Sequence, residues 1–195
     1  MTASAPRPRA TYDDILRAPE NMVAEIVGGE LVLSPRPAGR HARASSLMGA
    51  DLAGSFGRRR GGAGPGGWLI IDEPELHVAG ILPDVYVPDL AGWRRERMGE
   101  VPESHEFTVC PDWVCEVFSP ASSSRDLLVK GTLYHQAGVP WMWTVDPVQR
   151  FVDVYRAGER TWEHVARAEG DVEARLAPFD AVAFDLSEWW VRPAQ

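Results

Sequence analysis

The stretch DWVCEVFSP, residues 112–120, is apolar enough to form a buried strand, yet it carries a carboxylate, Glu116, near its centre. A lone ionised group in an apolar strand is costly unless it is paired or binds a metal, so Glu116 requires a partner from elsewhere in the chain. The alternative is an edge strand, on which Glu116 faces solvent at an alternate position. Both interpretations require a β-sheet.

The segment after this strand predicts a helix over SSSRDLLVKGTLYHQAG, residues 122–138. Ser123 precedes Asp126 by three residues, which is a capping pattern, and a glycine and a proline close the far end. Asp126, Lys130 and Tyr134 stand four residues apart, so they share a helix face that can turn toward the end of the preceding strand. An exposed Asp126–Lys130 ion pair would explain the same spacing and would contribute only a few tenths of a kcal/mol.

Lysine is almost absent from this chain. Of the 20 basic residues, 19 are arginine, and the remaining one is Lys130. Arginine serves surface charge and phosphate pairing well, whereas lysine offers a compact ammonium group whose pKa changes on burial. The choice of lysine at position 130 therefore suggests a chemical role, although chance survival of a surface lysine would also explain it.

The dipeptide Pro-Asp occurs twice, and its second copy supplies a candidate ligand. Residues 85–87 are apolar and predict a strand, so Asp89 emerges at its end and Asp84 falls in the turn before it. If Asp89 and Glu116 converge at one end of a sheet, their oxygens form a site for Mg²⁺, which activates water and neutralises a phosphoryl group. A lysine beside them can assist the water by lowering the cost of forming hydroxide, or can stabilise the charge that develops on phosphate, and this combination indicates nuclease chemistry.

The rest of the chain predicts an α/β or α+β sheet domain. A Gly-Gly turn between two alternating segments indicates a hairpin, and apolar residues at helical spacing indicate a long helix after it. Residues 93–98 are charged and predict a loop or a brief helix. We expect a disordered leader over residues 1–10 and a single domain over residues 11–192. The other expected elements are a hairpin of strands 23–27 and 30–33, a helix over 40–56, strands at 68–71 and 75–78, and further strands after residue 140.

Composition narrows the class of protein. The formal charge of −8 argues against non-specific binding to polyanions, but acidic residues are also what a nuclease uses to hold metal. No stretch has the character of a signal peptide or a membrane span, so a soluble cytoplasmic protein is expected. Cys110 and Cys115 have neither redox nor zinc-ligand spacing, which predicts two reduced, buried thiols.

The order of these motifs resembles the PD-(D/E)xK nuclease superfamily, and in its details the Uma-type branch of restriction endonucleases. The resemblance runs from about Thr11 to Trp190. It implies the restriction endonuclease-like fold, a mixed central sheet flanked by helices with an N-terminal hairpin. The matching stretches are EIVGGELVLSPRP, RHARASSLMGADL, EPELHV, VPDLAGWRRERM, PDWVCEVFSPASSSRDLLVKGTLYHQAGVPWMWTVDP and PFDAVAFDLSEWW.

The resemblance implies roles for individual residues. Asp89 and Glu116 match the metal-binding carboxylates of a Mg²⁺- or Mn²⁺-dependent DNA endonuclease. The position two residues after Glu116, where the superfamily motif has lysine, is Phe118, and Lys130 on the following helix matches the displaced lysine. The resemblance also implies His41, which would face the site from the long helix, and Glu25, which would support it. From its spacing to Lys130 on the same helix face, Asp126 is expected to support the site as well.

Two alternatives stay open at this level. The chain could be a catalytically silent module that binds nucleic acid or protein on the same fold, because fold and function are separable. Helix-start histidines are also often surface or capping residues, and strand alternation accounts for Glu25 nearly as well as a catalytic role does. We expect DNA as the partner and a homodimer, since exposed strand edges and eight tryptophans suggest a buried interface.

Overall fold

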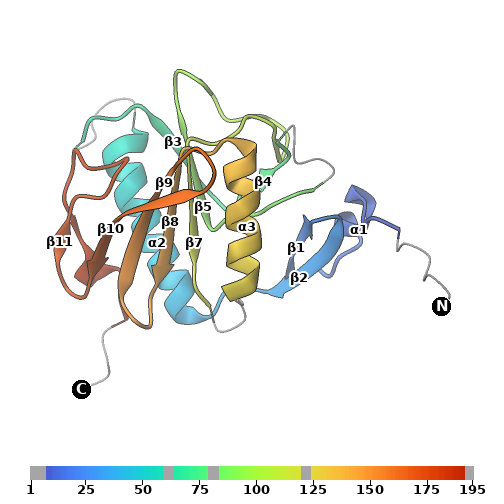
Figure 1. Ribbon diagram of the computed structural model, residues 1–195, viewed down its shortest axis with the longest axis horizontal. Coiled ribbons are helices and arrows are strands. Elements are labelled where there is room, and N and C mark those ends of the chain that lie inside the picture. Colours follow the sequence, from blue (N-terminus) through green and yellow to red (C-terminus); the bar gives the residue numbers. More distant parts are fainter. Residues whose placement is uncertain (1–7, 59–63, 79–83, 120–123, 192–195) are drawn as a thin grey trace.

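A mixed sheet of six strands forms the centre of the computed structural model, with a small hairpin set to one side (Figure 1). The structure describes residues 8–58, 64–78, 84–119 and 124–191, and the side chains of residues 124–126 lie outside this description. The strand order is β10–β9–β8–β7–β5–β3, in which only β7 and β8 run parallel. The strands are β3 (Trp68–Asp72), β5 (Leu90–Arg94), β7 (Trp113–Val117), β8 (Trp141–Asp146), β9 (Phe151–Ala157) and β10 (Trp162–Glu169).

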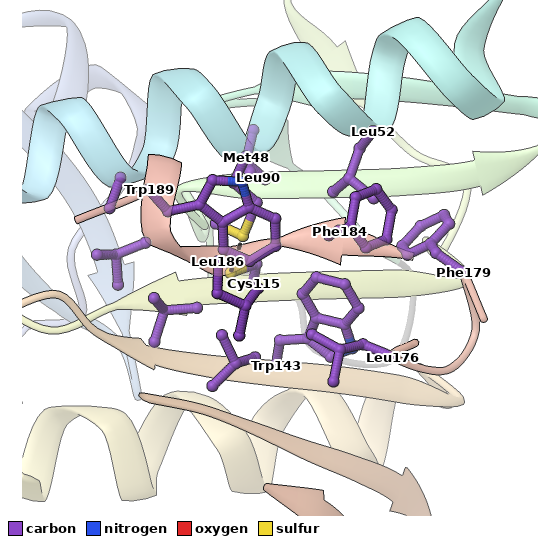
Figure 2. Packing of buried hydrophobic residues seen from close by; sticks show 14 of the residues in the cluster. Met48, Leu52, Leu90, Cys115, Trp143, Leu176, Phe179, Phe184, Leu186 and Trp189 are labelled. Carbon is purple, nitrogen blue, oxygen red and sulfur yellow. Dashed lines mark hydrogen bonds between the residues drawn. The ribbon is translucent and has the colours of Figure 1, made fainter. Parts of the chain in front are cut away.

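Two helices cover opposite faces of this sheet: α2 (Gly39–Leu52), which continues into a π-helical turn at Ala53–Gly57, and α3 (Ser124–Ala137) (Figures 1 and 2). The parallel pair β7 and β8 is joined through α3, as a parallel connection requires. The mixed α+β architecture predicted from the sequence is confirmed. The remaining elements are α1 (Tyr12–Leu16), β1 (Met22–Val27), β2 (Glu30–Pro35), β4 (Glu75–Leu76), β6 (Glu106–Phe107), β11 (Glu173–Ala174), β12 (Phe184–Asp185) and a 3₁₀ turn at Leu186–Glu188.

Strand β7 separates two hydrophobic clusters by the alternation of its side chains. Trp113, Cys115 and Val117 belong to the cluster beneath α2, part of which Figure 2 shows, whereas Val114 belongs to the cluster that includes residues of α3. Because side chains alternate along a strand, Glu116 faces the same side as Val114, toward α3. β7 lies between β5 and β8 and Glu116 is buried, so the edge-strand explanation for this carboxylate is wrong.

The strand expected at residues 85–87 is wrong in extent. Val85 and Tyr86 make only isolated bridges, and the continuous strand is β5, which includes part of the segment expected to be a charged loop. Pro88 has no backbone N–H to donate to a neighbouring strand, so continuous strand pairing begins only after it. Gly92 concealed β5 in the sequence because glycine weakens strand propensity, yet a Cβ there would lie within 3.1–3.2 Å of Ile70, Trp113 and Trp68 side-chain atoms.

The expected hairpin is confirmed, and Val27 pairs with Glu30 across its turn. Gly28 and Gly29 have φ values of 61° and 84°, which glycine adopts readily. Residues 1–7 of the expected leader lie outside the described residues, and Ala10 donates its N–H to the carbonyl of Gly29 at 2.8 Å. The extent of a single domain over residues 11–192 stays a prediction.

Six of the eight tryptophans are almost completely buried inside the chain: Trp68, Trp93, Trp113, Trp143, Trp189 and Trp190. They pack the core and are not available to an interface between two copies, so the tryptophan count no longer supports a dimer. Cys110 and Cys115 are free thiols, with Cys115 buried and Cys110 partly buried. In the described part of the chain, no helix combines the length and hydropathy needed to cross a membrane.

Asp84, the first of the two Pro-Asp aspartates, anchors the hairpin to the body of the protein. Its carboxylate accepts hydrogen bonds from the backbone N–H groups of Gly28 and Gly29 at 2.7 and 2.9 Å and from the Tyr86 hydroxyl at 2.7 Å. Arg9 lies 3.5 Å away. A buried carboxylate with several donors is stable only while they stay in place, so Asp84 has a structural role.

We expect Asp84→Ala to lower the free energy of unfolding by about 3 kcal/mol, because two turn N–H groups and a buried hydroxyl lose their acceptor. Urea unfolding followed by circular dichroism measures this. Asp13→Ala, at an exposed position on α1, is the control and should change stability by less than about 0.5 kcal/mol. Equal effects of the two substitutions would contradict the anchoring role.

Candidate active site

Asp89 and Glu116 lie side by side because β5 and β7 are antiparallel neighbours. Leu90 pairs with Cys115. Because the strands are antiparallel, Asp89, which precedes Leu90, lies beside Glu116, which follows Cys115. The Asp89 carboxylate accepts a hydrogen bond from the Val117 backbone N–H at 2.6 Å. The predicted convergence of two carboxylates therefore occurs, although Asp89 stands at the start of a strand and not at its end.

Lys130 joins four separate parts of the chain at this point. Its ammonium nitrogen lies 2.7 Å from Oε1 of Glu116 and 3.0 Å from Oε1 of Glu25, and it donates to the Val87 carbonyl at 3.2 Å. Glu25, on β1, also accepts the N–H of Val87 at 2.8 Å. The lysine side chain is 11% exposed, so this is a buried ionic cluster and not the surface pair that the helix spacing also allowed.

Tyr134 lies one turn further along α3 and is completely enclosed. Its hydroxyl donates to Oε1 of Glu116 at 2.6 Å, so Tyr134 and Lys130 hold the same carboxylate oxygen. Sequence reasoning placed Tyr134 on the Lys130 face through the four-residue spacing but assigned it no place in the site. The hydrogen bond from Lys130 to the Val87 carbonyl could not be predicted either, because no sequence pattern indicates it.

His41 reaches the carboxylate pair from the first turn of α2. Its Nε2 lies 3.0 Å from Oδ1 of Asp89, and in the described structure its buried Nδ1 has no hydrogen-bond partner. Burial by itself would lower the pKa of His41, but the hydrogen bond that His41 donates to Asp89 and the charges of Asp89 and Glu116 outweigh it, so the pKa is raised. Protonated His41 would offset part of the negative charge at this site.

Burial and neighbouring charges shift the pKa values of Glu116 and Lys130. Burial raises the pKa of Glu116 to about 7, and the charges of Asp89 and Glu25 add to this while Lys130 opposes it. Burial would lower the pKa of Lys130, but Glu116 and Glu25 more than compensate and raise it. Lys130 therefore stays protonated near neutral pH, and a further cation would relieve the remaining repulsion among the carboxylates.

Two more carboxylates, absent from the sequence-based site, stand at the end of β3 beside Asp89. Burial followed by the charge of Asp89 raises the pKa of Asp72, whose Oδ1 lies 3.5 Å from the Ser45 hydroxyl. Glu73 donates its N–H to the Asp89 carbonyl at 3.2 Å, and its pKa is raised by burial and by Asp72. Asp72 and Glu73 directly follow a predicted strand and precede Pro74, and this position in the sequence could have identified them as candidates.

These groups open into a pocket of about 510 Å³. Its lining includes Asp89, Glu116, Lys130 and His41 together with residues of the hairpin and α3. Charged groups that line a pocket can contact a bound ligand directly. A carboxylate pair with a buried ammonium group in such a place can bind a divalent cation and stabilise charge on a phosphoryl group.

A comparison with family models matches residues 10–187 to the Uma2 family, which is described as "Putative restriction endonuclease". The chain belongs to the Uma2 family. The resemblance inferred from the sequence motifs is therefore confirmed.

A solved structure has the same fold as this Uma2 chain. It is titled as a putative nuclease belonging to DUF820 from Anabaena variabilis, and it superposes with a TM-score of 0.72 at 20% sequence identity. The match covers 93% of this chain and 97% of the Anabaena chain. At this identity the likeness establishes the fold. No curated protein matches the sequence.

The structure of this Uma2 chain brings together most of the residues proposed from sequence. Five of the six lie around one pocket: Glu25, His41, Asp89, Glu116 and Lys130. The side chain of Asp126 lies outside the described residues. Phe118 occupies the position at which the superfamily motif has lysine. Its ring packs near that of Phe151, with the ring centroids 6.3 Å apart.

The donor set suits a hard divalent cation. Among the residues described, no group of three or more His, Cys, Asp or Glu side chains is arranged to hold a metal ion. Mg²⁺ commonly uses only one or two carboxylates and keeps several waters, so Asp89 and Glu116 together fit such an ion. Both described side-chain contacts of Glu116 use Oε1, and a cation beside this carboxylate would favour the charged form that burial disfavours.

We expect stability without metal to fall as pH rises from about 5 to 8, and to fall less in Glu116→Gln. The folded-state pKa of Glu116, about 7, exceeds its ordinary value of 4.5, so between these values the folded chain retains a proton that the unfolded chain has lost. Urea unfolding at several pH values in the presence of chelator measures the slope. Glu103→Gln, at an exposed position, should keep the wild-type slope. An unchanged slope in Glu116→Gln would contradict the raised pKa.

Proposed function

We propose that this Uma2 chain is a metal-dependent endonuclease that hydrolyses DNA phosphodiester bonds. Asp89 and Glu116 would hold Mg²⁺ or Mn²⁺, which supplies an activated water and neutralises charge on the phosphoryl group. The family supports a nuclease, and the nuclease title of the Anabaena structure agrees with it. The metal, the DNA substrate and the residue roles are our proposal.

The observation that carries the proposal is the position of the one lysine in the chain. Lys130 is buried, charged and 2.7 Å from a candidate metal-binding carboxylate. A protonated lysine cannot act as the proton acceptor, so its role is to stabilise negative charge on the phosphate and on the attacking oxygen. Substrate phosphate would compete with Glu25 and Glu116 for the same ammonium group.

The remaining side chains of the site would position Asp89, Glu116 and Lys130. His41 orients Asp89 through the 3.0 Å contact, and Tyr134 orients Glu116 through its hydroxyl. Glu25 shares the lysine and couples the hairpin to the site. Asp126 as a supporting residue stays a prediction.

We expect purified protein to nick supercoiled plasmid with Mg²⁺ or Mn²⁺ and not with chelator, and Asp89→Asn and Lys130→Met to reduce the rate at least about 100-fold. Removal of one charge-stabilising group from an active site typically has this effect. Conversion of supercoiled to open-circular DNA on agarose gels measures the rate. Gln136→Ala, exposed on the same helix as Lys130, is the control.

Unchanged nicking in Lys130→Met would contradict the role of the lysine. A wild-type protein that cuts no DNA with either metal would contradict the nuclease assignment. If that inactive protein still bound Mg²⁺ in calorimetry, it would fit a silent module that has kept its metal site.

A homodimer and a cytoplasmic location remain part of the proposal. Closed two-fold dimers are the commonest assemblies of soluble proteins. Light scattering should give twice the mass of the chain at micromolar concentration, and a monomer mass independent of concentration would contradict the dimer.

A further inference from the structure

Aliphatic side chains form part of the lining of the active-site pocket, whereas a nuclease that follows the DNA backbone would need positive charge there. One face of the hairpin supplies Val23, Val27 and Val32 to this lining. The strand register pairs these residues with Ser34, Glu30 and Glu25, which share their face. The inner face of the hairpin thus combines three valines with the glutamate that binds Lys130.

Helix α3 contributes two further aliphatic side chains to the lining. Leu127 and Val129 line the pocket, and Val129 is 38% exposed. Aliphatic side chains from both of these elements therefore line the pocket together with the ionised groups. A ligand that suits both parts has a flat or compact apolar portion and one anionic group that can reach Lys130.

The volume suits one such group. About 510 Å³ falls within the range of roughly 300–1,000 Å³ in which proteins enclose a small molecule. In a paired duplex the bases are stacked inside the helix and cannot enter a pocket, whereas an unpaired nucleotide can turn its base into one. Apolar side chains hold such bases in other enzymes that act on extruded nucleotides.

The charge of the pocket disfavours a continuous duplex. Its lining includes five carboxylates, those of Glu25, Glu30, Glu73, Asp89 and Glu116, against Lys130 and His41. No arginine is among the described residues that line it. A groove that follows a duplex needs many cationic contacts, but one phosphate needs only Lys130 and a metal ion beside it.

We propose that the pocket between the hairpin and α3 receives one unpaired base, so that the substrate is single-stranded or locally unpaired DNA and not a continuous duplex. This inference rests on the proposed nuclease function. The phosphate of the bound nucleotide would lie beside Lys130, and its base would contact Val32 and Val129. The hairpin is then the specificity-determining part of the site.

The test uses labelled oligonucleotides of one sequence in three forms: single-stranded, fully paired, and paired with an internal bulge. With Mg²⁺, the wild type should cut the single strand and the bulge at least 10-fold faster than the full duplex. Val32→Trp, which fills the pocket, should reduce cleavage of the single strand at least 10-fold. Leu33→Trp is the matched control, since Leu33 lies on the opposite face of the same strand, is 40% exposed, and should retain the wild-type rate.

Val129→Trp gives a second way to fill the pocket if Val32→Trp does not fold, which thermal unfolding would reveal. Equal or faster cutting of the full duplex would overturn the inference and leave the nuclease function intact. Unchanged single-strand cleavage in both folded pocket variants would also overturn it.

Binding separates the failure of the inference from the failure of the proposed function. If no form is cut, fluorescence anisotropy with Ca²⁺ in place of Mg²⁺ decides the matter. Tighter binding of the single strand than of the duplex, lost in Val32→Trp and kept in Leu33→Trp, would uphold the base pocket in a protein that is not a nuclease. Equal binding, or none, would overturn it.

Discussion

A single buried ammonium group links the separate parts of this structure. Lys130 on α3 meets Glu25 from the hairpin, Glu116 from the central strand, and the carbonyl of Val87 just before Asp89. Taking charges out of water costs several kcal/mol for each ion unless they are paired and hydrogen-bonded. The hairpin, β7 and α3 are therefore held in one arrangement, because any other would leave a buried charge without its partner.

This cluster contains an unusual carboxylate. Burial raises the pKa of Glu116 to about 7, although the ammonium group of Lys130 lies 2.7 Å away. A buried ionic cluster is often less stable than apolar residues of similar volume in its place. Active sites commonly contain such perturbed groups, and a cation bound beside Glu116 would favour its charged form. The nuclease proposal gives this shift a function.

The N-terminal hairpin has two functions that its sequence alone does not separate. Its turn is anchored by Asp84, and its inner face supplies both a glutamate to the ionic cluster and aliphatic side chains to the pocket. The two Pro-Asp aspartates thus have different tasks: Asp84 positions the hairpin, and Asp89 belongs to the site. A displacement of the hairpin would alter the pocket and the environment of Lys130 together.

The sequence by itself determined the elements that local patterns encode. The Gly-Gly hairpin, the helix around Lys130 and the apolar strand with its one carboxylate follow from turn chemistry and from periodicity, both of which act over a few residues. The lone lysine and the ordered motifs also identified the family and selected five residues that the structure brings together. Strand β5 was missed because Gly92 and the flanking charges have low strand propensity, and only close packing between neighbouring strands explains a glycine there.

Only the tertiary structure decided which groups touch and what their charges become. The antiparallel pairing of β5 with β7 brings Asp89 beside Glu116, and the docking of the hairpin brings Glu25 to a lysine more than a hundred residues away in the chain. Tyr134 and the backbone of Val87 entered the site only through these contacts. Burial and distance set the pKa of each group, and both depend on residues far apart in the sequence, so no local pattern contains them.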